Sequence, residues 1–266
     1  MTATRPTPGV APSWRQLSAP TAILFLAAAA AWVVVVALSR GMSGMPGTMG
    51  LSFGAFAAIW ALMMTAMMLP TIAPFAALYT RTLTDHRVRR IIELGVGYLL
   101  VWTAAAVPAY ALAWLAGTLV NTRTTAGTAL AATIFAAAGI YQLTPIKDRC
   151  LARCRSPLGF LLAYGNYRGR LRDLRVGISH GAFCLACCWA LMAVLIAVGL
   201  MNLLAMIVLA AVVLAEKTLT RGQRLSRAIG VVALVLAVAV VVRPSLAAGL
   251  APMPESPGMT GQPMSS

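Results

Sequence analysis

One nine-residue stretch of the chain holds three of its five cysteines and one of its two histidines. These residues are His180, Cys184, Cys187 and Cys188. Successive residues of an α-helix turn by about 100°, so a helix would place all four side chains on one arc about 100° wide. Thiolates and imidazoles bind soft and borderline metal ions, and thiolates favour Cu(I) or zinc over hard cations. The stretch is therefore a candidate site for metal binding or thiol chemistry.

The spacing of these four residues limits how one ion could use them. With a rise of about 1.5 Å per residue, Cys184 and Cys188 lie about 6 Å apart along a helix axis, and His180 and Cys188 about 12 Å apart. One ion cannot reach all four from a straight helix. It would take Cys184 with Cys187 or Cys188, or His180 with Cys184, and would complete its shell from another segment.

A second cysteine pair, Cys150 and Cys154, has the spacing C-x3-C. On a helix both sulfurs would share one face, and the neighbouring arginines would favour the thiolate form that binds metals. Zinc sites more often use C-x2-C or C-x4-C, so the spacing alone is weak evidence. We expect this pair to complete the shell of the first group.

Methionines supply a third soft ligand. Met67 and Met68 end an apolar run that also contains Met63 and Met64, which gives thioethers at i+3 and i+4 spacing. Methionine is also a common flexible filler of apolar cores, and that interpretation competes with metal binding. We treat Met67 and Met68 as candidate ligands within a helical bundle. The sequence leaves open whether the methionines of the Gly- and Pro-rich segments also bind metal: Met42, Met45, Met49, Met253, Met259 and Met264.

The composition determines the class of protein that carries these residues. Of 266 residues, 60% are hydrophobic and only 10% are charged. A soluble domain of this size would need more charge, and several apolar runs approach or exceed the roughly 20 residues that cross a bilayer. The net charge of +15 does not indicate nucleic acid, because the basic residues lie in short segments between apolar runs. The sequence predicts an all-α, polytopic transmembrane bundle.

The distribution of basic residues predicts an orientation. With the N-terminus in the cytoplasm, 18 of the 21 Lys and Arg residues fall in cytoplasmic segments and 3 in outer segments. Such an excess of cytoplasmic cations is typical of inner-membrane proteins, so we expect a multi-pass protein of the cell inner (plasma) membrane, N-in and C-out. Pro108 should kink the third span. Seven spans are expected, at about 21–38, 51–69, 91–118, 127–143, 176–200, 203–214 and 228–242.

Three units follow from this topology. Residues 1–19 are expected to be a flexible cytoplasmic start, 20–243 the transmembrane domain with a large inner loop at 146–175, and 244–266 a disordered extracytoplasmic tail. All five cysteines then lie on or near the cytoplasmic side. The cytosol keeps thiols reduced, and an odd cysteine count does not allow complete pairing, so metal binding or redox chemistry is favoured over structural disulfides.

Other chemistry has little support in the sequence. Glu216 and Lys217 end an apolar run, where the interface would solvate them as simple anchors. Nucleotide-binding, serine-hydrolase and zinc-protease motifs are not evident, so the sequence favours a non-enzymatic role.

Five segments of the sequence together resemble a bacterial family of predicted metal-binding integral membrane proteins of unassigned function. The resemblance covers about 51–220 and implies metal binding. The segments are Trp60–Pro70, Tyr141–Pro145, Cys150–Leu158 with its C-x3-C spacing, His180–Trp189 with its H-x3-C-x2-C-C pattern, and Met201–Leu203.

The leading hypothesis is an integral inner-membrane protein that binds a soft metal ion, with copper as Cu(I) favoured and zinc as the alternative, for transport or delivery. Its surroundings would be the lipid bilayer and a metal-delivery or membrane-complex partner, without nucleic acid. A membrane thiol oxidoreductase and a structural subunit of a membrane complex remain alternatives. The candidate ligands are His180, Cys184, Cys187, Cys188, Cys150, Cys154, Met67 and Met68.

Overall fold

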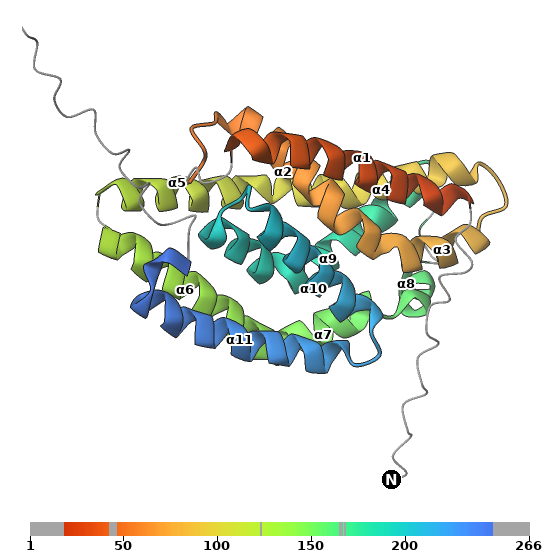
Figure 1. Cartoon of the computed structure of the whole chain (residues 1–266). Helices are drawn as coiled ribbons and strands as arrows, with labels where there is room; N and C mark the ends of the chain where they lie inside the picture. Colours follow the sequence, from red (N-terminus) through yellow and green to blue (C-terminus); the bar gives the residue numbers. More distant parts are fainter. Residues whose placement is uncertain (1–18, 43–46, 123, 165–166, 168, 247–266) are drawn as a thin grey trace, which may run out of the picture.

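The computed structural model describes residues 19–42, 47–122, 124–164, 167 and 169–246, and the regular structure in these ranges is helical throughout (Figure 1). The expected terminal segments lie almost wholly outside the described residues. Short 3-10 turns, η2 (Leu69–Ile72) and η3 (Pro244–Leu246), accompany the α-helices. The α-helices are α1 (Ala19–Met42), α2 (Phe53–Met68), α3 (Ala73–Arg81), α4 (Arg87–Ala104), α5 (Ala106–Thr122), α6 (Thr124–Leu143), α7 (Pro145–Cys154), α8 (Pro157–Tyr164), α9 (Arg172–Val198), α10 (Leu203–Thr218) and α11 (Gly222–Val242).

Six segments of the described chain are long and apolar enough to cross a membrane, where the sequence predicts seven. The difference is α10, which has 16 residues. At about 1.5 Å per residue it is about 24 Å long, less than the roughly 30 Å of a hydrocarbon core. The six segments are Pro20–Met42, Phe53–Arg81, Arg87–Val120, Thr125–Leu143, Arg172–Val198 and Gly222–Val242.

Prolines set several of the helix boundaries. Pro108 lies in the first turn of α5. It has no N–H to donate to the carbonyl of Ala104, four residues earlier, and in a continuous helix its ring would clash with that carbonyl. The helix is interrupted at Ala105, between α4 and α5, so the disturbance that the sequence predicts near Pro108 is confirmed. The predicted inner loop contains two helices, α7 and α8, and each begins at a proline, where the missing N–H costs nothing.

Helix α9 occupies the centre of the bundle, between a layer containing α1, α2 and α4 and a layer containing α6 and α11 (Figure 1). Its contact with α4 brings the two backbones together. A Cβ atom on Gly97 would lie 2.2 Å from the carbonyl oxygen of Leu174, and one on Gly177 would lie 2.1 Å from that of Leu94. Only glycine permits this approach, which is a common way of packing helices closely in membrane proteins.

The first turn of α9 is fixed by a buried carboxylate. Asp173 accepts hydrogen bonds from Arg90 of α4, at 2.8 Å from Nε, and from the hydroxyl of Tyr79 of α3. Three helices are therefore joined at one polar point. This contact fixes the rotation of α9 and the direction in which its next turns face.

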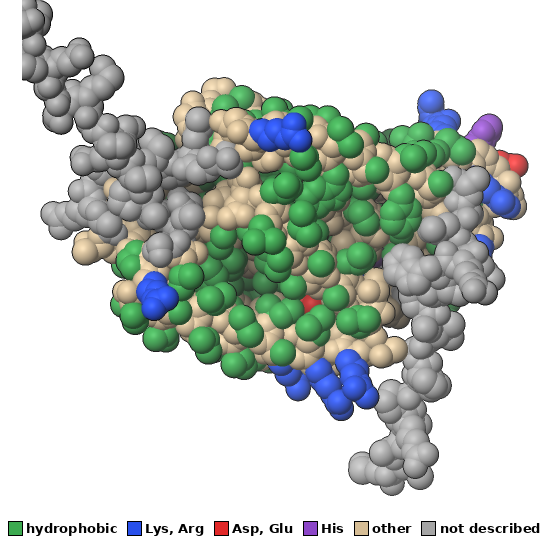
Figure 2. All heavy atoms as spheres, viewed as in Figure 1, with side chains coloured by type: hydrophobic (Ala, Val, Ile, Leu, Met, Phe, Trp, Pro, Cys, Tyr) green, Lys and Arg blue, Asp and Glu red, His purple; other side chains and the backbone are tan. Residues whose placement is uncertain are grey.

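The molecular surface is largely apolar. Hydrophobic side chains cover the middle of the face in Figure 2, over α2, α10 and α11, while Lys and Arg side chains lie mainly toward the edges. Leu26, Val33, Leu204 and Val242 are each about 70% exposed. An apolar surface of this extent indicates contact with lipid or with another protein.

The α4–α9 contact predicts a strong effect of one added methyl group. The Gly177→Ala change should lower the free energy of unfolding by about 1–3 kcal/mol or more, because the facing element is backbone and cannot rotate away. Thermal unfolding in detergent measures this. The matched control is Gly54→Ala in α2, whose added Cβ meets nothing within 4 Å. Equal stability of the two variants would contradict the close approach.

Candidate metal centre

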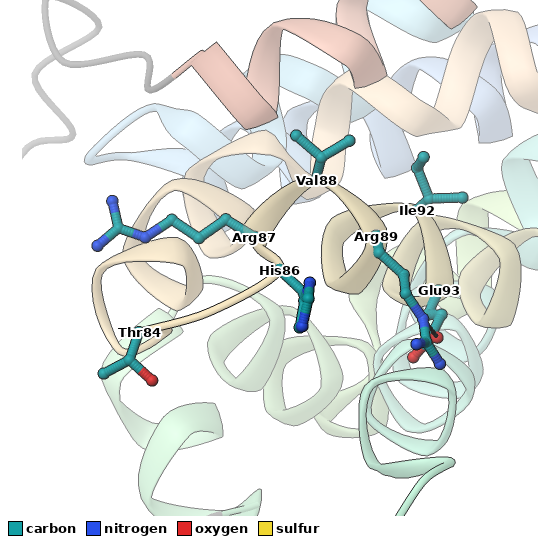
Figure 3. Close-up of a pocket in the computed structure, with 7 residues that line it drawn as sticks. All are labelled: Thr84, His86, Arg87, Val88, Arg89, Ile92 and Glu93. Atoms are coloured by element: carbon teal, nitrogen blue, oxygen red, sulfur yellow. Dashed lines mark hydrogen bonds and ion pairs between the residues drawn. The ribbon is translucent and has the colours of Figure 1, made fainter.

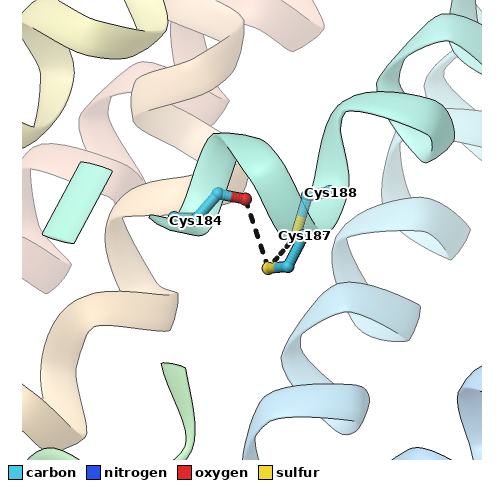
Figure 4. A group of neighbouring side chains, drawn as sticks. All are labelled: Cys184, Cys187 and Cys188. Carbon is cyan, nitrogen blue, oxygen red and sulfur yellow. Dashed lines mark hydrogen bonds between the residues drawn. The ribbon is translucent and has the colours of Figure 1, made fainter. Parts of the chain in front are cut away.

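Three cysteine sulfurs converge at the middle of α9. The Sγ atoms of Cys184, Cys187 and Cys188 all lie within 4.8 Å of one another, and all three residues are buried. The Sγ atoms of Cys187 and Cys188 are 3.2 Å apart, and the Cys187 thiol donates to the carbonyl of Cys184 (Figure 4). Two sulfurs bound tetrahedrally at about 2.3 Å from one ion would be about 3.8 Å apart. The three-cysteine group thus has nearly the dimensions of a thiolate metal site.

Cys154, at the end of α7, connects this group to a second helix. Its Sγ lies 3.8 Å from the Sγ of Cys187, and its side chain is only partly buried. Cys150 lies one turn earlier on α7, also partly buried, and packs against the same core. The expected meeting of the two cysteine segments therefore occurs through Cys154.

The remaining sequence-predicted ligands surround the group without joining the three sulfurs. His180 is buried and stacks on Phe75, with 4.8 Å between ring centroids, and lies 6.0 Å from the ring of Tyr98. Met67 and Met68 are buried in the same core, and the carbonyl of Met68 accepts a hydrogen bond from Tyr98 at 3.2 Å. These side chains form the apolar and aromatic wall beside the cysteines.

The sulfur of Cys184 has two polar partners from other helices. The ammonium of Lys217, on α10, lies 2.7 Å from it, and the hydroxyl of Tyr98, on α4, lies 2.9 Å from it. Lys217 also donates to the hydroxyl of Thr71 at 3.0 Å. An ammonium can only donate, so the sulfur accepts, and a charge-assisted bond of this kind stabilises a thiolate. Sequence reasoning did not identify Lys217, Tyr98 or Thr71 as part of the site.

A buried ion pair lies on the other side of the group. Nζ of Lys147 is 2.7 Å from Oε2 of Glu216 and donates to the carbonyl of Cys187 at 2.6 Å, and both charged side chains are fully buried. Gln142 donates to the second carboxylate oxygen at 2.9 Å, and Ser226 donates to Gln142 at 3.2 Å. The expectation that the interface solvates Glu216 is wrong: an interhelical network satisfies its carboxylate instead.

The charge of Lys147 is maintained by its neighbours. Burial acts to lower the pKa of Lys147, but Cys188, Glu216 and Cys187 oppose burial, and the pKa is raised above its ordinary value. The ammonium is therefore retained next to the carbonyl of Cys187. Lys147 holds the turn of α9 at Cys187, while Lys217 contacts Cys184, about one turn earlier.

One signal in the sequence could have revealed Lys217 as part of the site. Glu216 and Lys217 are adjacent, so on a helix their side chains point about 100° apart. A short helix packed between others cannot turn both toward solvent. In the structure Glu216 turns toward Lys147, and Lys217 turns toward Cys184.

A surface depression at the start of α4 offers no comparable chemistry. It is lined by residues from Thr84 to Glu93, and the labelled side chains project in different directions (Figure 3). Arg89 and Glu93 pair at 2.8 Å, as neighbours one turn apart commonly do. None of the five cysteines lines this depression.

The buried ion pair yields a prediction for stability. The Lys147→Met change should lower the free energy of unfolding by about 3–5 kcal/mol, because it leaves the carboxylate of Glu216 buried without a cation. Adding Glu216→Gln should restore much of the loss, since the amide can still bond to Gln142. Arg227→Met, which breaks the exposed pair with Asp148, should cost less than about 1 kcal/mol. Chemical unfolding in detergent measures all three, and a double variant no more stable than Lys147→Met alone would contradict the pairing.

Comparison with known proteins relates the chain to a metal-handling family. No curated protein and no solved structure matches the chain. The family model for PpoB2, described as a copper chaperone, matches residues 57–240, a range that includes all five cysteines, Lys147, Lys217 and the polar network around them. The match supports the metal-related part of the resemblance found in the sequence. The chain belongs to the PpoB2 family of copper chaperones.

Proposed function

We propose that the protein is an integral membrane copper chaperone that holds Cu(I) on the sulfurs of Cys184, Cys187 and Cys188. The observation that carries the proposal is the convergence of these three buried sulfurs within 4.8 Å of one another. Soft thiolate ligands without a carboxylate suit Cu(I). A closed zinc site needs four ligands around one ion, and Cys154 lies against Cys187 rather than against all three sulfurs. Copper is therefore favoured over zinc.

The route of the ion in this proposal is ligand exchange between neighbouring thiols. Cys154 is the partly exposed member, and its sulfur touches that of Cys187. An ion delivered to Cys154 by a metal-carrying partner passes to Cys187 and then to the buried group, with one new bond to sulfur formed as another breaks. Cys150, one turn from Cys154, is the candidate second ligand at the entry point. His180, Met67 and Met68 are candidate ligands for a later step.

A location in the cell inner membrane fits the proposal. Six apolar segments have the length and composition to span a bilayer, and large apolar side chains cover the surface. The excess of Lys and Arg in the segments around α7, α8 and the start of α11 favours a cytoplasmic position for this end. Cys154 would then receive copper from, or deliver it to, the cytoplasmic side.

Metal analysis of the purified protein tests the proposal. Protein loaded with Cu(I) in detergent without oxygen should retain about one copper per chain, the number that one three-sulfur group holds. Replacing Cys184, Cys187 and Cys188 together by serine should reduce bound copper to background. The matched control is Ala182→Ser, which adds a hydroxyl at an exposed position of the same helix, outside the group, and should leave the copper content unchanged.

Two outcomes of this experiment would count against copper binding. If the triple serine variant retains wild-type copper, the three-cysteine group is not the site. If the wild type binds no metal but its cysteines lose reactivity toward a thiol label after mild oxidation, the thiol oxidoreductase alternative gains support. Cys154 and Cys187 would then be the redox pair, because their sulfurs lie 3.8 Å apart on different helices, whereas a disulfide between the adjacent residues Cys187 and Cys188 would be strained.

A further inference from the structure

Lys217 is a partly buried cation whose ammonium is bonded to a buried candidate metal ligand. Its Nζ atom lies 2.7 Å from the sulfur of Cys184 and 3.0 Å from the hydroxyl of Thr71. Within the described part of the chain, Lys217 forms no ion pair with a carboxylate, whereas Lys147, the other lysine beside the cysteines, is paired with Glu216 at 2.7 Å. The positive charge of Lys217 is therefore available to balance negative charge on the cysteine sulfurs.

The charge of a bound ion explains why such a cation is needed. Cu(I) on the three sulfurs, with two of them as thiolates and the third as a neutral thiol, carries one net negative charge, and an unpaired charge in a low-dielectric interior is costly. The three-cysteine group is buried, and the charge of the Lys147–Glu216 pair is already balanced. An ammonium at Cys184 makes the loaded site neutral. It can remain there after the metal binds, because a coordinated thiolate still accepts hydrogen bonds.

We infer that Lys217 is the counter-cation of the cysteine group, which positions Cys184 for Cu(I) and balances the charge of the loaded site. The inference rests on the proposed function and assigns to Lys217 a role that the family description does not. Lys217 acts through Cys184 and does not itself bind the ion. It is a positioning residue that determines how tightly the site holds a monovalent soft cation.

The surroundings of Lys217 hold its ammonium in place. Thr71, in η2, accepts from the ammonium and itself donates to the carbonyl of Met68 at 2.7 Å. The preceding residue, Glu216, is fixed by its pair with Lys147. The end of α10 is therefore held from two sides. Two elements, α4 and α10, contact that sulfur through Tyr98 and Lys217, and η2 holds the ammonium through Thr71.

Two substitutions separate the charge of Lys217 from its hydrogen bonds. Lys217→Gln keeps a donor of similar reach and removes the charge, while Lys217→Arg keeps the charge. In competition with a chromophoric Cu(I) chelator, the Gln variant should bind Cu(I) roughly 10- to 100-fold more weakly than the wild type does, as for other residues that support metal ligands. The Arg variant should recover most of the affinity. Arg224→Gln, which neutralises an exposed cation of α11, is the control and should change nothing.

A second measurement does not depend on bound copper. In the metal-free protein, the alkylation rate of Cys184, followed by peptide mass spectrometry, should fall in the Gln variant and return in the Arg variant, because a neighbouring cation favours the reactive thiolate. Thermal unfolding verifies that each variant folds. If the wild type binds no copper, the proposed function is overturned. The alkylation rate of Cys184 still tests in that case whether Lys217 acts on this sulfur. Wild-type copper affinity in a folded Gln variant would overturn the role of Lys217.

Discussion

The close contact between α4 and α9 determines what the cysteines meet. Gly97 and Gly177 let the two backbones approach until a methyl group on either would overlap a carbonyl oxygen. This approach puts Tyr98 against Cys184, and the Asp173–Arg90 pair fixes the rotation of α9 at one end of the contact. Without the glycines the helices would separate, and the Cys184 sulfur would lose its contact with the Tyr98 hydroxyl of α4.

Charge balance is the second constraint on the centre. An apolar bundle tolerates buried ions only when each has a partner. Lys147 and Glu216 neutralise one another and also bond to the backbone of Cys187 and to Gln142. Lys217 meets a sulfur instead of a carboxylate. This difference makes Lys147 a part of the scaffold and Lys217 a part of the proposed copper site.

Much of the fold could be predicted from the sequence, since hydropathy and proline positions depend on local chemistry. The helical class and the interruption near Pro108 are confirmed. The segment predicted as the sixth span, 203–214, is helical in α10, but α10 has 16 residues and is not among the six described segments that are long and apolar enough to cross a membrane. The neighbours of α10 depend on contacts between distant segments, and periodicity carries no information about those contacts.

The sequence by itself determined which side chains could bind a soft metal and that Cys184, Cys187 and Cys188 would share a helical face, because residue type and helical period are local properties. Only the tertiary structure decided that Cys154 meets Cys187, and that His180 stacks on Phe75 outside the three-sulfur group. It also decided that Lys217 turns inward to Cys184. Those outcomes depend on how helices distant in the chain pack, since a buried charge takes whichever partner the packing places within hydrogen-bond distance.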